Sequence, residues 1–337
     1  MSPMNRRTAS LALGALAVAP LSSVGSAHSA RAPEVGTPPW PRKPVRIINP
    51  FPVGGGPDGT ARIVADKLSR QWQQPVVVDN RPGGNGYIAI DAFKRGATDG
   101  SDILLLDNVH IAAYPYLFKK LPYNVERDFQ LVLPLFRTFF FVCVPTDSPY
   151  QSMADLIADA KARPGALNYG SWSVGNAVHL GSALLESLTN TRMQHVIYKE
   201  TSQLYANVAT GVLAFALGTS ATAGPLVQAG KLRFLAVMAP QRLRGYAQVP
   251  TGPESGAPAQ AIATGWNALA VSPSTPPAVV ETIHRDVTAA LQEPDIPAKF
   301  QTFGYENYFP TPQEFRHFIQ QEQARFSAVI RRAQLQL

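Results

Sequence analysis

The sequence contains a single cysteine, Cys143, among 337 residues. An intramolecular disulfide is therefore impossible, and the apolar run over residues 139–144 predicts a buried strand in which this thiol is a small hydrophobic group. The six histidines are also spread out, since none lies within four residues of another. Without a histidine or cysteine pair at ligand spacing, we expect no metal site.

Charged residues make up only 16% of the chain, and no long run of one sign occurs. The formal net charge is +7, but the basic residues are scattered or stand in short pairs such as Lys119-Lys120. This distribution argues against a nucleic-acid groove and is compatible with a mild attraction for anionic solutes. Beyond the first 30 residues no apolar run approaches the roughly 20 residues of a membrane-spanning helix.

Residues 1–30 have the pattern of a signal peptide. Arg6 and Arg7 precede an apolar run over residues 11–19, and small residues follow near a cleavage-like site. The run is too short to cross a bilayer, so we expect a cleaved export signal rather than an anchor. The general secretory route is expected, or the twin-arginine route, which Arg6-Arg7 matches in part.

After a proline-rich, extended tail over residues 31–43, segments typical of strands and helices alternate. The first block predicts strands at 45–49, 75–79 and 103–106 and helices around 61–72 and 90–93. The second block predicts strands at 139–144, 167–169, 195–198, 212–217, 234–237 and 266–271 and helices around 153–162, 177–188, 204–209 and 225–229. Apolar stripes over 279–291 and 315–330 predict two further helices. The chain is therefore expected to be an α/β protein with mainly parallel sheets.

A glycine-rich loop, Gly54-Gly55-Gly56-Pro57-Asp58-Gly59, joins the first predicted strand to the first helix. Backbone N–H groups at a helix N-terminus favour a carboxylate or phosphate, so this loop is a candidate anion site. The plainer alternative is a tight turn in which glycine serves geometry alone.

The same loop also satisfies the dinucleotide pattern through Gly54, Gly56 and Gly59, and Asp79 closes the next strand 20 residues later. An exported NAD(P)-dependent oxidoreductase is therefore an alternative. Against it, residues 51–53 separate the strand from the glycines, and Asp58 would bring a negative charge close to the pyrophosphate.

A second loop, over residues 171–175, misses the nucleophile elbow of esterases by its first glycine. An esterase using Ser173 as nucleophile and His179 as base is the other alternative. The favoured interpretation is that Ser171, Ser173 and the helix N-terminus bind an anion, while His179 caps or packs. Lys199, at the end of the next strand, either balances a ligand carboxylate or is solvated.

An ordered series of short motifs resembles one known family from end to end. The series includes Trp40-Pro41-Arg42-Lys43-Pro44-Val45-Arg46, Phe51-Pro52-Val53-Gly54-Gly55-Gly56-Pro57-Asp58, Asn80-Arg81-Pro82-Gly83-Gly84, Lys120-Leu121-Pro122-Tyr123, Val174-Gly175 with His179-Leu180, His195-Val196-Ile197-Tyr198-Lys199 and Ala229-Gly230-Lys231-Leu232-Arg233. On these motifs the chain resembles the substrate-binding receptors of tripartite tricarboxylate transporters, also called Bug receptors.

The resemblance implies a two-lobed, type II-like periplasmic binding protein. Lobe one would comprise residues 44–138 plus 265–337, and lobe two residues 139–264. Such a receptor captures a small carboxylate between its lobes, as in a Venus flytrap, and presents it to the membrane subunits of the transporter. It is expected to be a periplasmic monomer without a cofactor, not an enzyme and not a nucleic-acid-binding protein. The ligand-binding residues carried over from the family are Phe51, Gly54, Gly55, Gly56, Asp58, Asn85, Asn108, Ser171, Ser173, Val174, Gly175, Tyr198 and Lys199.

Several departures from the family pattern bear on the ligand. Ala214 and Gly218 stand where many members have aspartate, and Glu200 replaces a usual glycine. The loss of acidic groups would suit a plain anion, whereas Glu200 would favour an amine if it reached the ligand. Trp172 could stack on an aromatic acid.

Overall fold

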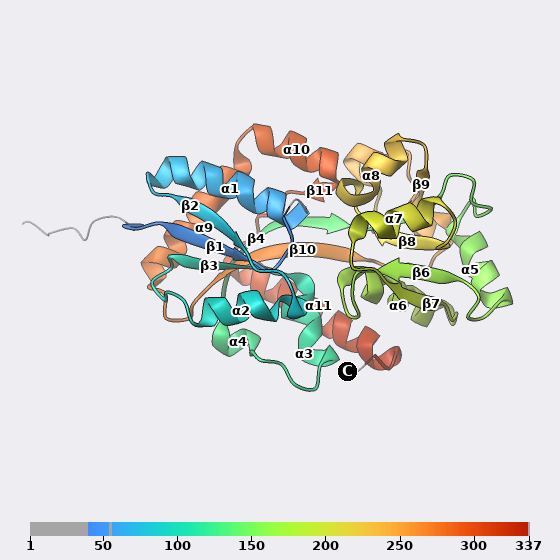
Figure 1. Ribbon diagram of the computed structural model, residues 1–337, viewed down its shortest axis with the longest axis horizontal. Coiled ribbons are helices and arrows are strands. Elements are labelled where there is room, and N and C mark those ends of the chain that lie inside the picture. Colours follow the sequence, from blue (N-terminus) through green and yellow to red (C-terminus); the bar gives the residue numbers. More distant parts are fainter. Residues whose placement is uncertain (1–39, 54–55, 336–337) are drawn as a thin grey trace, which may run out of the picture. The chain divides into compact units, whose positions relative to one another are not determined.

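This computed structural model describes residues 40–53 and 56–335 (Figure 1). The described residues form one compact unit. The predicted signal peptide, most of the predicted tail and the ligand candidates Gly54 and Gly55 lie outside the described residues. Within the described ranges, no helix combines the length and the hydropathy needed to cross a membrane.

The first sheet has six strands in the order β11-β4-β10-β3-β1-β2. Its strands are β1 (Val45–Asn49), β2 (Val76–Asn80), β3 (Asp102–Asp107), β4 (Gln130–Phe139), β10 (Thr264–Val271) and β11 (Tyr305–Glu306). Strand β1 lies between β3 and β2 and is parallel to both. It is buried on both faces, as its apolar sequence predicts, because helices cover the sheet above and below.

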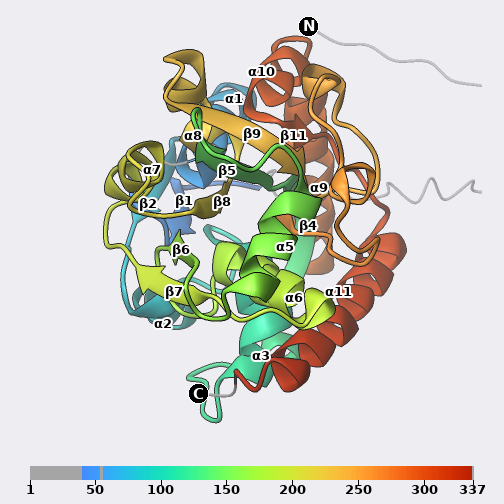
Figure 2. The same cartoon turned by 90° about the vertical axis from the view of Figure 1, so that its right-hand side faces the viewer.

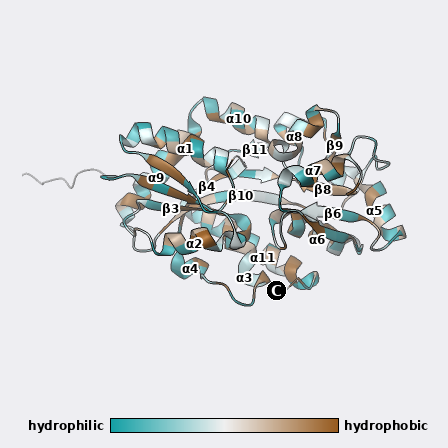
Figure 3. Cartoon of the chain, viewed as in Figure 1, coloured by the Kyte–Doolittle hydropathy of each residue, from teal (hydrophilic) through white to brown (hydrophobic). Residues whose placement is uncertain are grey.

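Helices cover both faces of this first sheet. One face packs on α1 (Gly56–Trp72), α9 (Pro277–Gln292) and α10 (Asp295–Phe303). The other packs on α2 (Tyr87–Lys94), α4 (Val125–Asp128) and α11 (Pro312–Arg332). Neighbouring residues of β1 point to opposite faces, so Ile47 contacts the first group and Ile48 the second. Hydrophobic and hydrophilic stripes alternate on these helices (Figure 3).

The second sheet has five strands in the order β7-β6-β8-β5-β9. They are β5 (Phe141–Pro145), β6 (Asn168–Ser171), β7 (Gln194–Ile197), β8 (Phe215–Gly218) and β9 (Leu232–Val237). One face packs on α5 (Met153–Ala162) and α6 (Ala177–Thr189), the other on α7 (Thr201–Ala209) and α8 (Ser220–Gln228). Short helical turns occur at Gly84–Gly86, Val109–Ala113, Arg244–Tyr246 and Pro253–Ser255, and α3 spans Tyr114–Leu117.

The chain passes from the first sheet to the second between β4 and β5 and returns along β10. Two helical segments associated with the first sheet also enter the core of the second. Tyr114 and Leu117 of α3 and Phe326 and Ile330 of α11 belong to the cluster that contains α6 (Figure 2). The two sheets therefore share buried packing around α6.

The predicted α/β class with two helix-flanked sheets is confirmed, but both sheets are mixed rather than mainly parallel. Strands β3-β1-β2 and β7-β6-β8 are parallel blocks, while β4, β5, β9, β10 and β11 pair antiparallel. The reason is that β4, β5 and β10 carry the chain between the sheets, so they run against the strands of the βα units. The predicted burial of Cys143 is confirmed, and burial raises the pKa of its thiol.

Candidate functional site

The candidate residues lie in loops at the carboxyl ends of the two parallel blocks. In the first sheet these loops follow β1, β2 and β3, and in the second they follow β6 and β7. Parallel neighbours end at the same edge of a sheet, and this edge is where open α/β sheets bind ligands. The topology therefore gathers the candidates of each sheet at one edge.

Asp58 was predicted in the glycine-rich loop but lies in the first turn of α1, which begins earlier than predicted. It is 1% exposed and accepts hydrogen bonds from Asn49 Nδ2 at 3.2 Å, Asn80 Nδ2 at 2.7 Å and Arg62 Nε at 3.0 Å. These partners come from the ends of β1 and β2 and from α1 itself. Asp58 thus fixes the start of α1 against both strand ends.

Phe51 and Gly56 flank the two undescribed glycines. The Phe51 N–H donates to Asn49 Oδ1 at 3.0 Å, its carbonyl accepts from Asn80 Nδ2 at 3.0 Å, and its ring lies edge-on to His110, with 6.2 Å between centroids. Gly56 begins α1, where a Cβ would overlap the hydroxyl of Tyr305. A side chain at position 56 would therefore require Tyr305 to move.

Asn85 and Asn108 follow β2 and β3. Asn85 adopts a left-handed conformation (φ 53°, ψ 37°), and its carbonyl lies 3.1 Å from His110 Nε2. The buried Asn108 amide donates to the Thr264 carbonyl at 3.0 Å, so it ties the end of β3 to the start of β10. Sequence reasoning missed His110, although a polar residue within four positions of the end of a predicted strand was a usable signal.

Ser171 ends β6, and Ser173 lies in the hydrogen-bonded loop that follows. The Ser171 hydroxyl donates to the Ser173 carbonyl at 2.9 Å, lies 2.7 Å from His195 Nε2 and accepts from Asn176 Nδ2 at 3.0 Å. Asn176 also caps α6, because its Oδ1 accepts from the N–H groups of Val178 and His179. Asn176 and His195 are further residues that sequence reasoning did not assign to the site.

Val174 and Gly175 complete this loop. Gly175 has φ +82°, and its N–H donates to His179 Nδ1 at 3.0 Å. A Cβ at Gly175 would overlap Leu117 Cδ2 and lie 3.5 Å from Tyr114 Cε1. The loop after β6 of the second sheet therefore lies against α3, the helix that follows β3 of the first sheet.

Tyr198 and Lys199 follow β7, next to the same loop. The Tyr198 N–H donates to the Ser171 carbonyl at 2.9 Å, and its hydroxyl accepts from Asn207 Nδ2 at 2.9 Å. Lys199 and Glu200 are both exposed. The backbone of Tyr198 therefore supports the candidate loop, while a role for either charged side chain stays a prediction.

The hydrogen bonds do not assemble the serine triad that an esterase would need. His179 Nδ1 accepts from a backbone N–H, and the hydroxyl that pairs with a histidine is that of Ser171, with His195. Among the described residues, neither ring is hydrogen-bonded to a carboxylate that could orient it as a base. The interpretation of His179 as a capping and packing residue agrees with its contacts.

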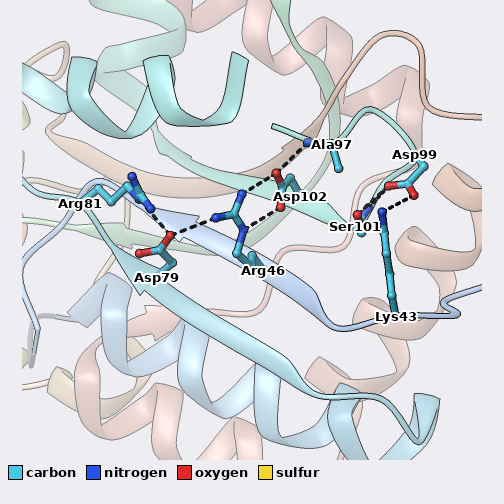
Figure 4. Close-up of polar contacts among 8 residues, drawn as sticks. All are labelled: Lys43, Arg46, Asp79, Arg81, Ala97, Asp99, Ser101 and Asp102. Carbon is cyan, nitrogen blue, oxygen red and sulfur yellow. Dashed lines mark hydrogen bonds and ion pairs between the residues drawn. The ribbon is translucent and has the colours of Figure 1, made fainter. Parts of the chain in front are cut away.

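Asp79, the acidic residue of the dinucleotide alternative, lies in a network of ion pairs (Figure 4). It accepts from Arg81 Nε at 2.9 Å and lies 3.7 Å from Arg46 NH1. Arg46 also pairs with Asp102 at 2.7 Å. Burial favours the neutral form of Asp102, but hydrogen bonds from Arg46 and the Ala97 N–H outweigh it and hold the pKa of Asp102 below its usual value. Asp79 thus has cationic partners where a ribose-binding carboxylate would face a ligand.

The rings of His179 and His195, next to the loop after β6, are stacked with their centroids 4.1 Å apart. Burial and then the neighbouring His195 lower the pKa of His179 from 6.5 to about 4, and burial also lowers that of His195. Both rings are therefore neutral at pH 7. This neutrality leaves His179 Nδ1 able to accept from the Gly175 N–H.

The pair of His179 and His195 predicts that the folded protein becomes less stable in acid. The unfolded chain takes up a proton on His179 near pH 6.5 and the folded chain only near pH 4, so stability falls as the pH drops through that window. We expect His179 to account for roughly 3 kcal/mol of this loss. Urea unfolding of the wild type and of His179→Gln at pH 7 and pH 4 measures it. The variant should lose less stability on acidification, whereas His317→Gln, on the exposed face of α11, should behave as the wild type. Equal losses in H179Q and wild type would contradict the assignment.

Comparison with known proteins gives a consistent result. The sequence model of TctC, described as the tripartite tricarboxylate transporter family receptor, matches residues 60–335. The chain is 30% identical over 293 residues to protein BugT of Bordetella pertussis, covering 87% of this chain and 90% of that protein.

Solved structures are similar over the same extent. The structure described as R. palustris Rpa4515 with adipate is 28% identical, with a TM-score of 0.80 over 88% of this chain and 98% of that one. MatC (Rpa3494) from Rhodopseudomonas palustris with bound malate has a TM-score of 0.76 at 22% identity, covering 86% of this chain and all of that one, and supports the fold alone.

Proposed function

Because this chain belongs to the tripartite tricarboxylate transporter receptor family, the Bug receptors, we propose that it is a periplasmic receptor for a small carboxylate. The protein would act as two lobes, one formed by residues 44–138 and 265–337 and the other by residues 139–264. The ligand would bind between these lobes. Membrane subunits of a tripartite tricarboxylate-type transporter would receive it. No covalent step is part of the proposal.

One observation carries the proposal: a continuous series of contacts joins the candidate loops of the two sheets. The ring of Phe51 contacts His110, His110 lies 5.2 Å from Tyr114, and Tyr114 with Leu117 lies against Gly175. The glycine-rich loop and the loop after β6 are thus connected through α3. A carboxylate could be bound by backbone N–H groups of both loops at once.

The arrangement supports capture by backbone dipoles. Helices α1 and α6 both begin at candidate loops, and helix N-termini favour negative charge. A ligand that contacts both lobes stabilises the closed arrangement by the contacts it makes only there. The adipate and malate of the similar structures belong to those proteins, and they motivate a dicarboxylate as the first ligand to test here.

A thermal-shift panel tests the proposal. Mono-, di- and tricarboxylates, aliphatic and aromatic, are added at about 100 times an expected Kd in the micromolar range, where binding stabilises by about 2.7 kcal/mol. At least one is expected to raise Tm by several degrees. The matched control is the uncharged amide of each active acid, with every carboxylate amidated, and it should leave Tm unchanged. A panel without any shift, or equal shifts from acid and amide, would contradict carboxylate recognition.

A further inference from the structure

His110 lies where all three βα loops of the first sheet meet. It closely follows β3, and its side chain is 5% exposed. The loop after β1 reaches it through the Phe51 ring, and the loop after β2 through the carbonyl of Asn85. Both contacts join His110 to residues that are distant in sequence.

The hydrogen bonds of His110 hold its ring in one orientation. Nδ1 contacts the Asp107 carboxylate, and Nε2 lies 3.1 Å from the Asn85 carbonyl. The Asp107 N–H lies 3.4 Å from Nδ1, and the His110 N–H donates to Asp107 Oδ1 at 3.3 Å. Both ring nitrogens therefore have a fixed polar partner.

The loop after β2 is built around this ring. Gly86 has φ +83°, and a Cβ there would overlap His110 Nε2. The neighbouring Asn85 is left-handed, which costs a non-glycine residue free energy that its surroundings must offset. The bond to His110 supplies such an offset, because it fixes the Asn85 carbonyl in the strained turn.

The backbone of His110 is fixed as well. The Tyr123 hydroxyl donates to the His110 carbonyl at 2.7 Å, and the ring packs edge-on to Tyr114 of α3. Tyr114 in turn reaches Gly175 in the loop after β6. One residue thus contacts both neighbouring candidate loops of its own sheet and, through α3, the candidate loop of the other.

We propose that His110, oriented by Asp107, is a positioning residue that pre-organises the loops after β1 and β2 for ligand binding. This inference rests on the proposed function for its effect on affinity. Ordering the loops before the ligand arrives removes an entropic cost from binding, so loss of His110 should weaken binding more than it weakens folding.

Two substitutions separate the contacts of His110. His110→Phe keeps a ring against Phe51 and Tyr114 but removes both hydrogen bonds. His110→Gln retains an N–H group that can reach the Asn85 carbonyl while losing the contact of the ring with Asp107. His317→Gln, exposed on α11, is the matched control.

Two measurements then test the role. Calorimetric titration with the carboxylate that gives the largest thermal shift should show a Kd higher by at least about tenfold for H110F, a smaller increase for H110Q and none for H317Q. Hydrogen exchange of the ligand-free protein should be faster in H110F over residues 81–86 and 49–53 but unchanged over residues 171–176.

The exchange measurement needs no ligand, so it separates this inference from the proposed function. If no carboxylate binds the wild type, the proposed function fails while the loop ordering is still tested. The positioning role would be overturned if exchange in H110F rose uniformly along the chain. It would also be overturned if exchange in both loops of H110F equalled that of the wild type. An H110F affinity within about twofold of the wild type would overturn it equally. If H110F does not fold, the same criteria apply to H110Q.

Discussion

Gly175→Ala is expected to raise the Kd for the carboxylate by roughly 10- to 100-fold, equivalent to about 1.4 to 2.7 kcal/mol. Two physical causes act together. A left-handed backbone costs a residue with a Cβ about 1–2 kcal/mol, and the new methyl group would overlap Leu117, which is fully buried. The loop must therefore move away from α3, and its N–H groups leave the positions proposed for ligand contact.

Gly211→Ala is the matched control for this substitution. Gly211 has φ +74°, close to that of Gly175, but nothing lies within 4 Å of its Cβ position. The control therefore carries the same backbone penalty without the overlap. Calorimetric Kd values and Tm are measured for both variants. If G175A binds as tightly as G211A, contact between the loop after β6 and α3 does not govern binding.

Asp58→Ala is expected to lower the free energy of unfolding by about 1–3 kcal/mol, because the buried Asn49 amide would lose its acceptor. Asn49 and Asn80 would lose the Oδ1 acceptor they share, and Arg62 would lose its ion pair with Oδ2. Asp58→Asn retains one carbonyl acceptor and should cost less. The measurement is the urea midpoint at constant m-value.

The same helix provides the control. Asp66 and Arg70 form an ion pair with the same i, i+4 spacing as Asp58 and Arg62, but both side chains of this second pair are largely exposed. Asp66→Ala should therefore change the midpoint only slightly, because solvent screens exposed pairs. A D58A midpoint no lower than that of D66A would mean that Asp58 does not organise the ends of β1 and β2.

Regular apolar patterns predicted most of the secondary structure, and the exceptions have identifiable causes. Strand β4 was not predicted because Pro134 interrupts its apolar run, and proline is excluded from most strand interiors. The structure accommodates Pro134 at an irregularity: Asn267 pairs with Phe136 while the next residue, Ala268, pairs with Pro134. Strand β11 has only two residues, too few for any period to appear.

The loops of the candidate site could be predicted, but their internal contacts could not. Glycine patterns and strand ends marked residues 54–59 and 171–175 because these signals are local, although residues 56–59 already belong to α1. The bond between Ser171 and His195 depends instead on the register of β6 and β7, and that of His110 with Asn85 on the order β3-β1-β2. Such pairings are properties of the folded sheets and leave no pattern at a fixed sequence spacing.

The most direct test of the proposed receptor function is a crystal structure with the carboxylate that gives the largest thermal shift. We predict that the ligand carboxylate lies within hydrogen-bond distance of backbone N–H groups from residues 54–58 and from residues 171–175 in the same molecule. A carboxylate bound at another surface, or held by the loops of one sheet alone, would contradict capture between two lobes.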